Sequence, residues 1–194
     1  MEKVMEELDS KDREGFFGDK EKGVVTWAES QGLPYLDACI KESFRLHPAP
    51  GLPIERIVPP QGAEIAGHFI KGGTIVGCNA WVVHRRPEIF GEDVEVFRPE
   101  RWIEGDEKKI KEMGATLLHF GMGARTCIGK NISLLEIYKV IPTVLRRFEV
   151  CCSSLPLEGE NGLGLDFDAD VGCRYASKTR PRNGQSTTPG SSAS

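Results

Sequence analysis

The ten residues from Phe120 to Gly129 read Phe-Gly-Met-Gly-Ala-Arg-Thr-Cys-Ile-Gly, and a long apolar helix pattern follows them directly. The stretch is a glycine-spaced loop that carries one cysteine, Cys127. Glycines at 121, 123 and 129 allow the backbone to pass close to a bulky group and to adopt positive φ angles. Cys127 stands just before the expected helix N-terminus, where free N–H groups and the helix dipole favour a negatively charged thiolate.

The residue types in this loop suit an anionic metal cofactor. A thiolate binds metal ions, and Arg125, two residues before the cysteine, can hold an anion beside it. A single thiolate does not complete a four-coordinate zinc site. One cysteine, one arginine and a close-approach glycine loop therefore favour a flat, anionic metal cofactor, namely haem. The alternative is a tight turn around a buried structural cysteine.

The loop resembles the haem-binding signature of the cytochrome P-450 family, Phe-x-x-Gly-x-Arg-x-Cys-x-Gly. The matching positions are Phe120, Gly123, Arg125, Cys127 and Gly129. The resemblance implies that Cys127 is the axial iron ligand, that Arg125 holds a haem propionate, and that Phe120, Gly121, Gly123 and Gly129 shape the loop around the cofactor.

The overall composition is that of an ordinary globular chain. The 194 residues are 39% hydrophobic and 28% charged, which suffices for one domain with one core. The net charge is −4 and no long basic stripe is present, which argues against nucleic acid as a partner. No apolar run reaches the ~18–20 residues that span a bilayer. The six cysteines show no C-x-x-C pair, so reduced thiols are expected.

A second motif lies on the helix expected from Leu33 to His47, which contains Glu42-Ser-Phe-Arg45. Glu and Arg three residues apart share a helix face, and on that evidence alone a solvated surface pair is the simpler reading. The segment also resembles the Glu-x-x-Arg helix of the same family. Further on, Phe97-Arg-Pro-Glu-Arg101-Trp102 resembles the family's Pro-Glu-Arg-Phe motif, with Trp instead of Phe. The resemblance implies a buried structural cluster of Glu42, Arg45 and Arg101.

A small β unit is predicted between these motifs, with strands at 54–58, 64–70 and 74–78 and a turn at Lys71-Gly72-Gly73. The family's corresponding segment lines the substrate pocket, which implies pocket roles for Pro50, Gly51, Leu52, Pro53 and Ile54. It also supplies an arginine to a haem propionate, and Arg56 is the matching position. The alternative for Arg56 is an edge-strand arginine that faces water.

The rest of the chain is interpreted more simply. Short helices are predicted at 1–10 and 79–84, a loop at 11–32, a solvated meander at 103–113, and a strand at 148–152. The segment 130–148 is apolar nearly all round, which predicts a buried helix containing Pro142. Residues 153–177 form a divergent segment without a clear assignment, and residues 178–194 have the composition of a disordered tail.

The resemblance covers about residues 1–152 and implies a mostly α fold with small β-sheets (α+β), as the C-terminal part of a longer haem-thiolate monooxygenase. It implies haem as cofactor, molecular oxygen and an apolar small molecule as substrates, and an NADPH-dependent reductase as electron donor. The sequence does not give the location of this chain; the resemblance implies, for the family, the endoplasmic reticulum membrane, facing the cytosol through an N-terminal anchor. Two alternatives remain open: a non-catalytic fragment that cannot hold haem, and a thiolate-haem isomerase or dehydratase.

Overall fold

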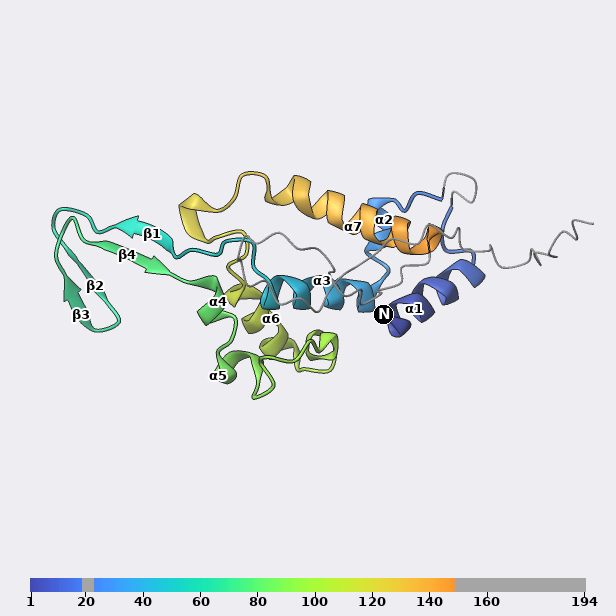
Figure 1. Cartoon of the computed structure of the whole chain (residues 1–194), viewed down its shortest axis with the longest axis horizontal. Coiled ribbons are helices and arrows are strands. Elements are labelled where there is room, and N and C mark those ends of the chain that lie inside the picture. Colours follow the sequence, from blue (N-terminus) through green and yellow to red (C-terminus); the bar gives the residue numbers. More distant parts are fainter. Residues whose placement is uncertain (19–22, 149–194) are drawn as a thin grey trace, which may run out of the picture.

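The computed structural model describes residues 1–18 and 23–148 of the chain (Figure 1). The α-helices are α1 (Glu2–Arg13), α2 (Trp27–Ser30), α3 (Pro34–Leu46), α4 (Ala80–Val83), α5 (Pro87–Phe90), α6 (Glu107–Thr116) and α7 (Lys130–Arg147). The strands are β1 (Ile54–Ile57), β2 (Ala63–Ile65), β3 (His68–Ile70) and β4 (Ile75–Cys78), and two 3-10 turns are η1 (Pro99–Trp102) and η2 (Gly123–Arg125). The predicted α+β composition, mostly helical, is confirmed.

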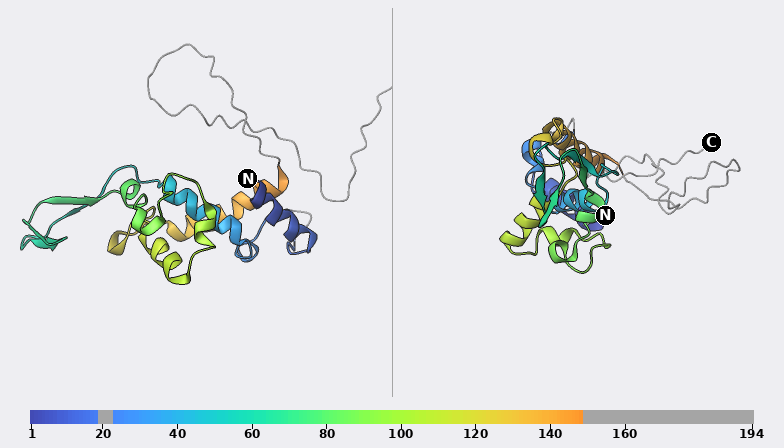
Figure 2. Two further views of the ribbon diagram at one scale, coloured as in Figure 1. Left: turned by 90° about the horizontal axis from the view of Figure 1, so that it is seen from below. Right: turned by 90° about the vertical axis from the view of Figure 1, so that its left-hand side faces the viewer.

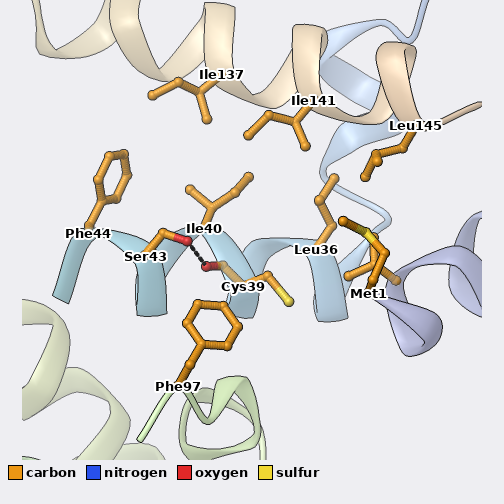
Figure 3. Close-up of a pocket in the computed structure, with 11 residues that line it drawn as sticks. Met1, Leu36, Cys39, Ile40, Ser43, Phe44, Phe97, Ile137, Ile141 and Leu145 are labelled. Atoms are coloured by element: carbon orange, nitrogen blue, oxygen red, sulfur yellow. Dashed lines mark hydrogen bonds between the residues drawn. The ribbon is translucent and has the colours of Figure 1, made fainter. Parts of the chain in front are cut away.

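The two longest helices, α3 and α7, lie side by side and run in opposite directions (Figure 1, Figure 3). Pro34 occupies the first turn of α3, where its missing N–H costs nothing. Gly129 is the N-cap residue of α7, so this helix starts directly after the cysteine loop. Both helices match the segments predicted from the apolar spacing of the sequence.

The main core lies where α1, α3 and α7 meet. Its buried side chains come from these helices and from the segments beside them: Val4, Leu8, Phe17, Val25, Leu33, Leu36, Ile40, Tyr138 and Leu145. Arg146, in the last turn of α7, forms an ion pair with Asp12 of α1 at 2.6 Å and lies 3.9 Å from the ring centroid of Phe17. Apolar burial is the dominant stabilising term in such a core.

A smaller core joins α5, η1 and α6 to α3 through Ala38, Phe90, Trp102 and Met113. The meander predicted at 103–113 was wrong, because α6 is a helix whose Met113 is buried. Asp106 caps it by accepting the backbone N–H of Lys109 at 2.7 Å. The loop predicted at 11–32 was also incomplete, since α1 continues to Arg13 and Thr26 opens α2 with a capping box.

The four strands form an arm that projects from one end of the helical body (Figure 1, Figure 2). β1 pairs with β4, and β2 pairs with β3, both antiparallel. The predicted single strand at 64–70 was wrong, because Ala66 (φ 51°) and Gly67 (φ 79°) turn the chain between β2 and β3. Consecutive positive φ angles are what a two-residue hairpin turn requires. Gly72 is needed farther along, since a Cβ there would lie 2.4 Å from the Pro60 carbonyl oxygen.

Helix α7 is less buried than its composition suggests. Only Tyr138, Pro142 and Leu145 are buried, whereas Ile132 is 64% exposed and Leu135 is 41% exposed. The prediction of burial all round was therefore wrong for the residues that the structure describes. The helix leaves an apolar side uncovered close to the cysteine loop, at its first turns.

Within residues 1–18 and 23–148, no helix combines the length and the apolar character needed to cross a bilayer. The strand predicted at 148–152 falls almost entirely beyond the described residues, apart from Phe148, which forms a single bridge. The segments 153–177 and 178–194 lie wholly outside the described residues.

Candidate functional site: an exposed thiol braced by a buried ion cluster

The cysteine loop folds back on itself through two glycines with positive φ, Gly121 (71°) and Gly123 (70°). L-residues with side chains seldom adopt such angles, which accounts for glycine at both positions. Two backbone hydrogen bonds close the loop: Gly121 N–H donates to the Leu118 carbonyl at 2.8 Å, and Cys127 N–H donates to the Phe120 carbonyl at 2.8 Å. These bonds fix the backbone that carries the thiol.

The Cys127 side chain is exposed, unlike the buried structural cysteine of the alternative interpretation. Exposed apolar residues lie near Cys127 in the sequence: Ile128 is 103% exposed, Met122 is 53% exposed and Ile132 of α7 is 64% exposed. An exposed thiol with exposed apolar residues near it in the sequence fits a flat metal cofactor, because such residues could pack against an apolar ring while the sulfur binds the metal.

No group of three or more His, Cys, Asp or Glu side chains is placed to hold a metal ion in the part of the chain that the structure describes. Cys127 would therefore bind a metal as its single protein ligand from this region. A single thiolate ligand suits haem iron, where the porphyrin supplies four further ligands. The residues present fit haem and do not fit a zinc site.

The two arginines predicted to hold propionates are both exposed. Arg125 lies in η2, two residues before the cysteine, with its side chain at the surface. Arg56 lies on β1, and its Nη1 donates to the neighbouring Glu55 carbonyl at 2.6 Å. The β arm leaves the helical body at the end where the cysteine loop lies (Figure 1). The structure shows both guanidinium groups at the surface, and it shows no contact between them among the described residues.

The structure brings Glu42, Arg45 and Arg101 together in the interior. Arg45 Nη2 lies 2.9 Å from Glu42 Oε1, and both side chains are 0% exposed. Arg101 Nε lies 3.0 Å from the same oxygen, with 2% exposure. The solvated surface pair that the spacing alone suggested is therefore wrong. A buried ion pair of this kind is stable only when its remaining polar atoms also have partners.

Three partners of this cluster were missed by sequence reasoning. Trp102 Nε1 donates to Glu42 Oε2 at 2.9 Å, and the backbone N–H of Arg98 donates to Glu42 Oε1 at 3.0 Å. Asp93 lies 3.0 Å from Arg101 and supplies a second negative charge. The substitution of Trp for Phe in the Pro-Glu-Arg-Phe motif was visible in the sequence, but the partner of the indole N–H was not.

The cluster keeps the Glu42 carboxylate charged. Burial by itself would raise the pKa of Glu42, but hydrogen bonds from Arg45, from the Arg98 amide and from Trp102 outweigh burial and lower the pKa. The guanidinium groups of Arg45 and Arg101 also donate to backbone carbonyls of Val94, Val96 and Phe90. The cluster therefore joins α3 to η1 and to the segment between α5 and η1.

An aromatic stack connects α3 directly to the cysteine loop. Phe44 lies between Glu42 and Arg45 in sequence, and its ring stacks on His119 at 4.1 Å with an interplanar angle of 11°. Phe44 also meets Phe120, the first residue of the loop, at 5.6 Å in an edge-on arrangement. The helix that carries the ion cluster thus supports the loop that carries the thiol.

The predicted substrate-pocket residues lie between α3 and β1, where Gly51, Leu52 and Pro53 are exposed and Pro50 and Ile54 are partly buried. A cavity of about 350 Å³ is found elsewhere, between α1, α3 and α7 (Figure 3). Its walls are mainly aliphatic and include Leu36, Ile40, Ile137, Ile141 and Leu145. Neither the predicted pocket residues nor Cys127 line this cavity, so it is separate from the cysteine site.

Comparison with known proteins gives the same family for most of the chain. A family model described as cytochrome P-450 matches residues 1–161. A cytochrome P-450 monooxygenase of Aspergillus terreus is 50% identical over 150 residues, which is 77% of this chain and 30% of the relative. The cytochrome P-450 monooxygenase cicH of Emericella nidulans is 54% identical over 127 residues, covering 66% of this chain and 25% of the relative.

A third relative carries a more specific name. Pisatin demethylase of Fusarium vanettenii is 46% identical over 128 residues, which is 66% of this chain and 24% of that protein. The chain thus spans about a quarter to a third of the length of these relatives. With the family model matching far more than half of its residues and with the cysteine loop and ion cluster in place, the chain belongs to the cytochrome P-450 family.

Proposed function

We propose that this chain carries the cysteine-ligand side of a haem-thiolate monooxygenase. The observation that supports the proposal best is the exposed Cys127 thiol, carried by a loop that packs through Phe120 on Phe44 of α3, the helix that holds the buried ion cluster. A structural cysteine would be expected in the interior instead. The names of the monooxygenase relatives support the same reaction class.

Cys127, the two arginines and the loop glycines would each contribute to binding the cofactor. Cys127 would bind the iron as a thiolate, and Arg125 together with Arg56 would pair with the two propionates. Gly121 and Gly123 shape the loop, and Gly129 ends it at the start of α7, while Phe120 fixes it to α3 through Phe44. When bound, haem supplies the oxygen-activating chemistry, which a thiolate ligand promotes by donating electron density to the iron.

Glu42, Arg45 and Arg101 are assigned a structural role in this proposal. None of the three reaches the surface near the thiol, and their polar atoms are used by one another and by backbone carbonyls. A buried network that is fully satisfied makes its surroundings rigid. The cluster therefore holds the region under the loop, and it does not take part in the chemistry.

The complete reaction would require partners outside this chain. A monooxygenase takes two electrons from a reductase, NADPH-dependent by family, and inserts one atom of molecular oxygen into an apolar substrate. The name of the pisatin demethylase relative favours oxidative removal of a methyl group from a small molecule as one such reaction. Pro50, Gly51, Leu52, Pro53 and Ile54 are proposed to contact that substrate. By family, the site faces the cytosol at the endoplasmic reticulum membrane.

The cysteine assignment is tested by comparing two exposed thiols. Haem is added to the 194-residue chain, the iron is reduced, and carbon monoxide is bound. Thiolate ligation gives a strongly red-shifted Soret band. Cys127→Ser is expected to abolish that band, whereas Cys78→Ser, which changes an exposed cysteine on β4, is expected to keep it. A Cys127→Ser variant that retains the band would contradict the assignment.

Two alternatives to the monooxygenase proposal are tested by further measurements. If the chain takes up no haem at all, the reading as a non-catalytic fragment is favoured. If the longer enzyme converts its substrate without a reductase, isomerase or dehydratase chemistry on the same thiolate is favoured over oxygen insertion.

A further inference from the structure

His84 is a fully buried histidine that none of the roles above uses. It is the C-cap residue of α4, its side chain is 0% exposed, and its ring meets Phe90 edge-on at 6.3 Å. A polar ring at this depth costs free energy unless both nitrogens have partners. Both of them do.

The two partners fix the position of the imidazole proton. The Leu118 backbone N–H donates to His84 Nε2 at 2.7 Å, so Nε2 must be the unprotonated nitrogen. His84 Nδ1 lies 3.1 Å from the Arg45 carbonyl oxygen, which only accepts, so Nδ1 must carry the proton. The surroundings of His84 thus select the neutral ring with its proton on Nδ1.

These two bonds connect the ion cluster to the cysteine loop. On one side, the Arg45 backbone carbonyl accepts the Nδ1–H of the His84 ring, and Arg45 Nη1 donates to the His84 carbonyl at 3.1 Å. On the other side, the Leu118 carbonyl accepts the Gly121 N–H, and two residues farther on the Phe120 carbonyl accepts the Cys127 N–H. One continuous set of hydrogen bonds and peptide units runs from Arg45 through His84 and Leu118 to the thiol.

We propose that His84 is a positioning residue for Cys127: its Nδ1–H form ties the Arg45 end of α3 to Leu118 and thereby sets where the cysteine loop lies. The proposal rests on the proposed haem-thiolate function only in what the loop is positioned for. The link itself is a property of the chain without cofactor.

The charges around His84 favour the same form. Burial lowers the pKa of His84 more than the carbonyls of Arg45 and Phe44 raise it, and the positive charges of Arg45 and Arg85 lower it further. Another imidazole close enough to interact is that of His119. A second proton would place a donor on Nε2 against the donating Leu118 amide, which would break the link.

The first experiment measures the tautomer in the wild-type chain. The 194-residue protein is labelled with ¹⁵N-histidine, and the ring nitrogens of His84 are read by long-range proton–nitrogen correlation at pH 7. The expected result is a neutral ring protonated at Nδ1, which is the less common tautomer of free histidine. A ring protonated at Nε2, or on both nitrogens, would overturn the proposal without any variant having to fold.

The second experiment tests whether the hydrogen-bond acceptor at His84, and not the imidazole ring as such, protects the Leu118 amide. His84→Leu removes the acceptor, whereas His84→Gln can place an amide oxygen near the position of Nε2. Exchange of the Leu118 amide with solvent is expected to be about five- to tenfold faster in His84→Leu than in wild type, and partly restored in His84→Gln. His68→Leu, at an exposed histidine on β3, serves as the control and should leave Leu118 unchanged.

Haem binding then tests the positioning role. In His84→Leu the red-shifted Soret band of the reduced carbon monoxide complex should fall by at least half relative to wild type, while His84→Gln keeps most of it. An unchanged band in His84→Leu, with faster Leu118 exchange, would overturn the positioning role. If Cys127→Ser and wild type give the same spectrum, the haem proposal fails instead, and the tautomer and the exchange rate still decide the link.

Discussion

Replacing Glu42 with glutamine perturbs the buried cluster at its centre while keeping the shape of the side chain. The carboxylate accepts five hydrogen bonds: two from Arg45 at 3.0 and 2.9 Å, one from Arg101 at 3.0 Å, one from the Arg98 amide at 3.0 Å, and one from Trp102 at 2.9 Å. A glutamine oxygen replaces only one of the two acceptor atoms, and its amide group would face donors. Two or more donors therefore lose their partner, Arg45 loses its carboxylate partner, and Arg101 keeps only Asp93.

The expected loss is large compared with the stability of a domain. Removing one partner of a buried ion pair costs about 3–5 kcal/mol, because a charge remains unpaired in the interior. The free energy of unfolding of a domain is about 5–15 kcal/mol, so about a fifth or more of it would disappear. With a urea dependence of about 1–3 kcal/mol per molar, the midpoint of unfolding should fall by roughly 1–5 M.

A matched control exists on the surface of α6. Glu112 pairs with Lys109 at the same three-residue spacing, at 3.6 Å, but the side chains are 54% and 37% exposed. Glu112→Gln is expected to cost less than about 0.5 kcal/mol. Both variants are measured by urea denaturation followed by tryptophan fluorescence. If Glu42→Gln and Glu112→Gln lower the free energy of unfolding by the same amount, burial does not determine the strength of this pair and the reasoning is refuted.

Two further perturbations test the same region. Trp102→Phe should lower the free energy of unfolding by about 1–2 kcal/mol in thermal denaturation, because Glu42 Oε2 loses a donor. The control is Trp81→Phe, which should cost less because the indole N–H of Trp81 has no partner among the described residues. Equal losses in the two variants would argue against the hydrogen bond between Trp102 and Glu42. Burial, and then electrostatic interactions with His84 and Lys130, lower the pKa of His119 to about 4. The unfolded chain therefore takes up this proton first: stability is fully present above pH 6.5 and falls as the pH drops from 6.5 towards 4. After allowance for partial exposure, His119 contributes up to about 2 kcal/mol to the fall in the free energy of unfolding between pH 6.5 and 4, and His119→Phe should remove this contribution. A pH dependence identical to that of wild type would contradict the lowered pKa of His119.

Local signals in the sequence predicted some elements and not others. Apolar residues at helical spacing, with Pro34 at one end, defined α3 well, because a periodic pattern over many residues averages out local exceptions. The turn between β2 and β3 was missed because Ala66 adopts a positive φ, which alanine seldom does, so the sequence lacks the Asn-Gly or Asp-Gly signal of such turns. By contrast, α6 carried a readable signal, with Asp106 as N-cap followed by good helix formers.

The candidate site divides in a similar way. The loop around Cys127 is contiguous in sequence, so its glycines and its cysteine were visible together. The ion cluster is not contiguous, and only its resemblance to a family motif suggested that Glu42 and Arg101, 59 residues apart, would meet. The hydrogen bonds from Trp102 and from His84 could not be predicted, because they depend on how α3, α4 and η1 pack. The exposed side of α7 was mispredicted because composition does not show which neighbours cover a helix.

The β arm has a consequence for how unfolding will be observed. A two-stranded ribbon has little stability of its own in water, and several apolar side chains of the arm face solvent, among them Ile57, Phe69 and Ile75. The ribbon should therefore open and close on its own, many times for each global unfolding event. All three tryptophans lie in the helical body, at 27, 81 and 102. Tryptophan fluorescence will therefore not report the opening of the ribbon, and only a probe placed on the strands will detect it.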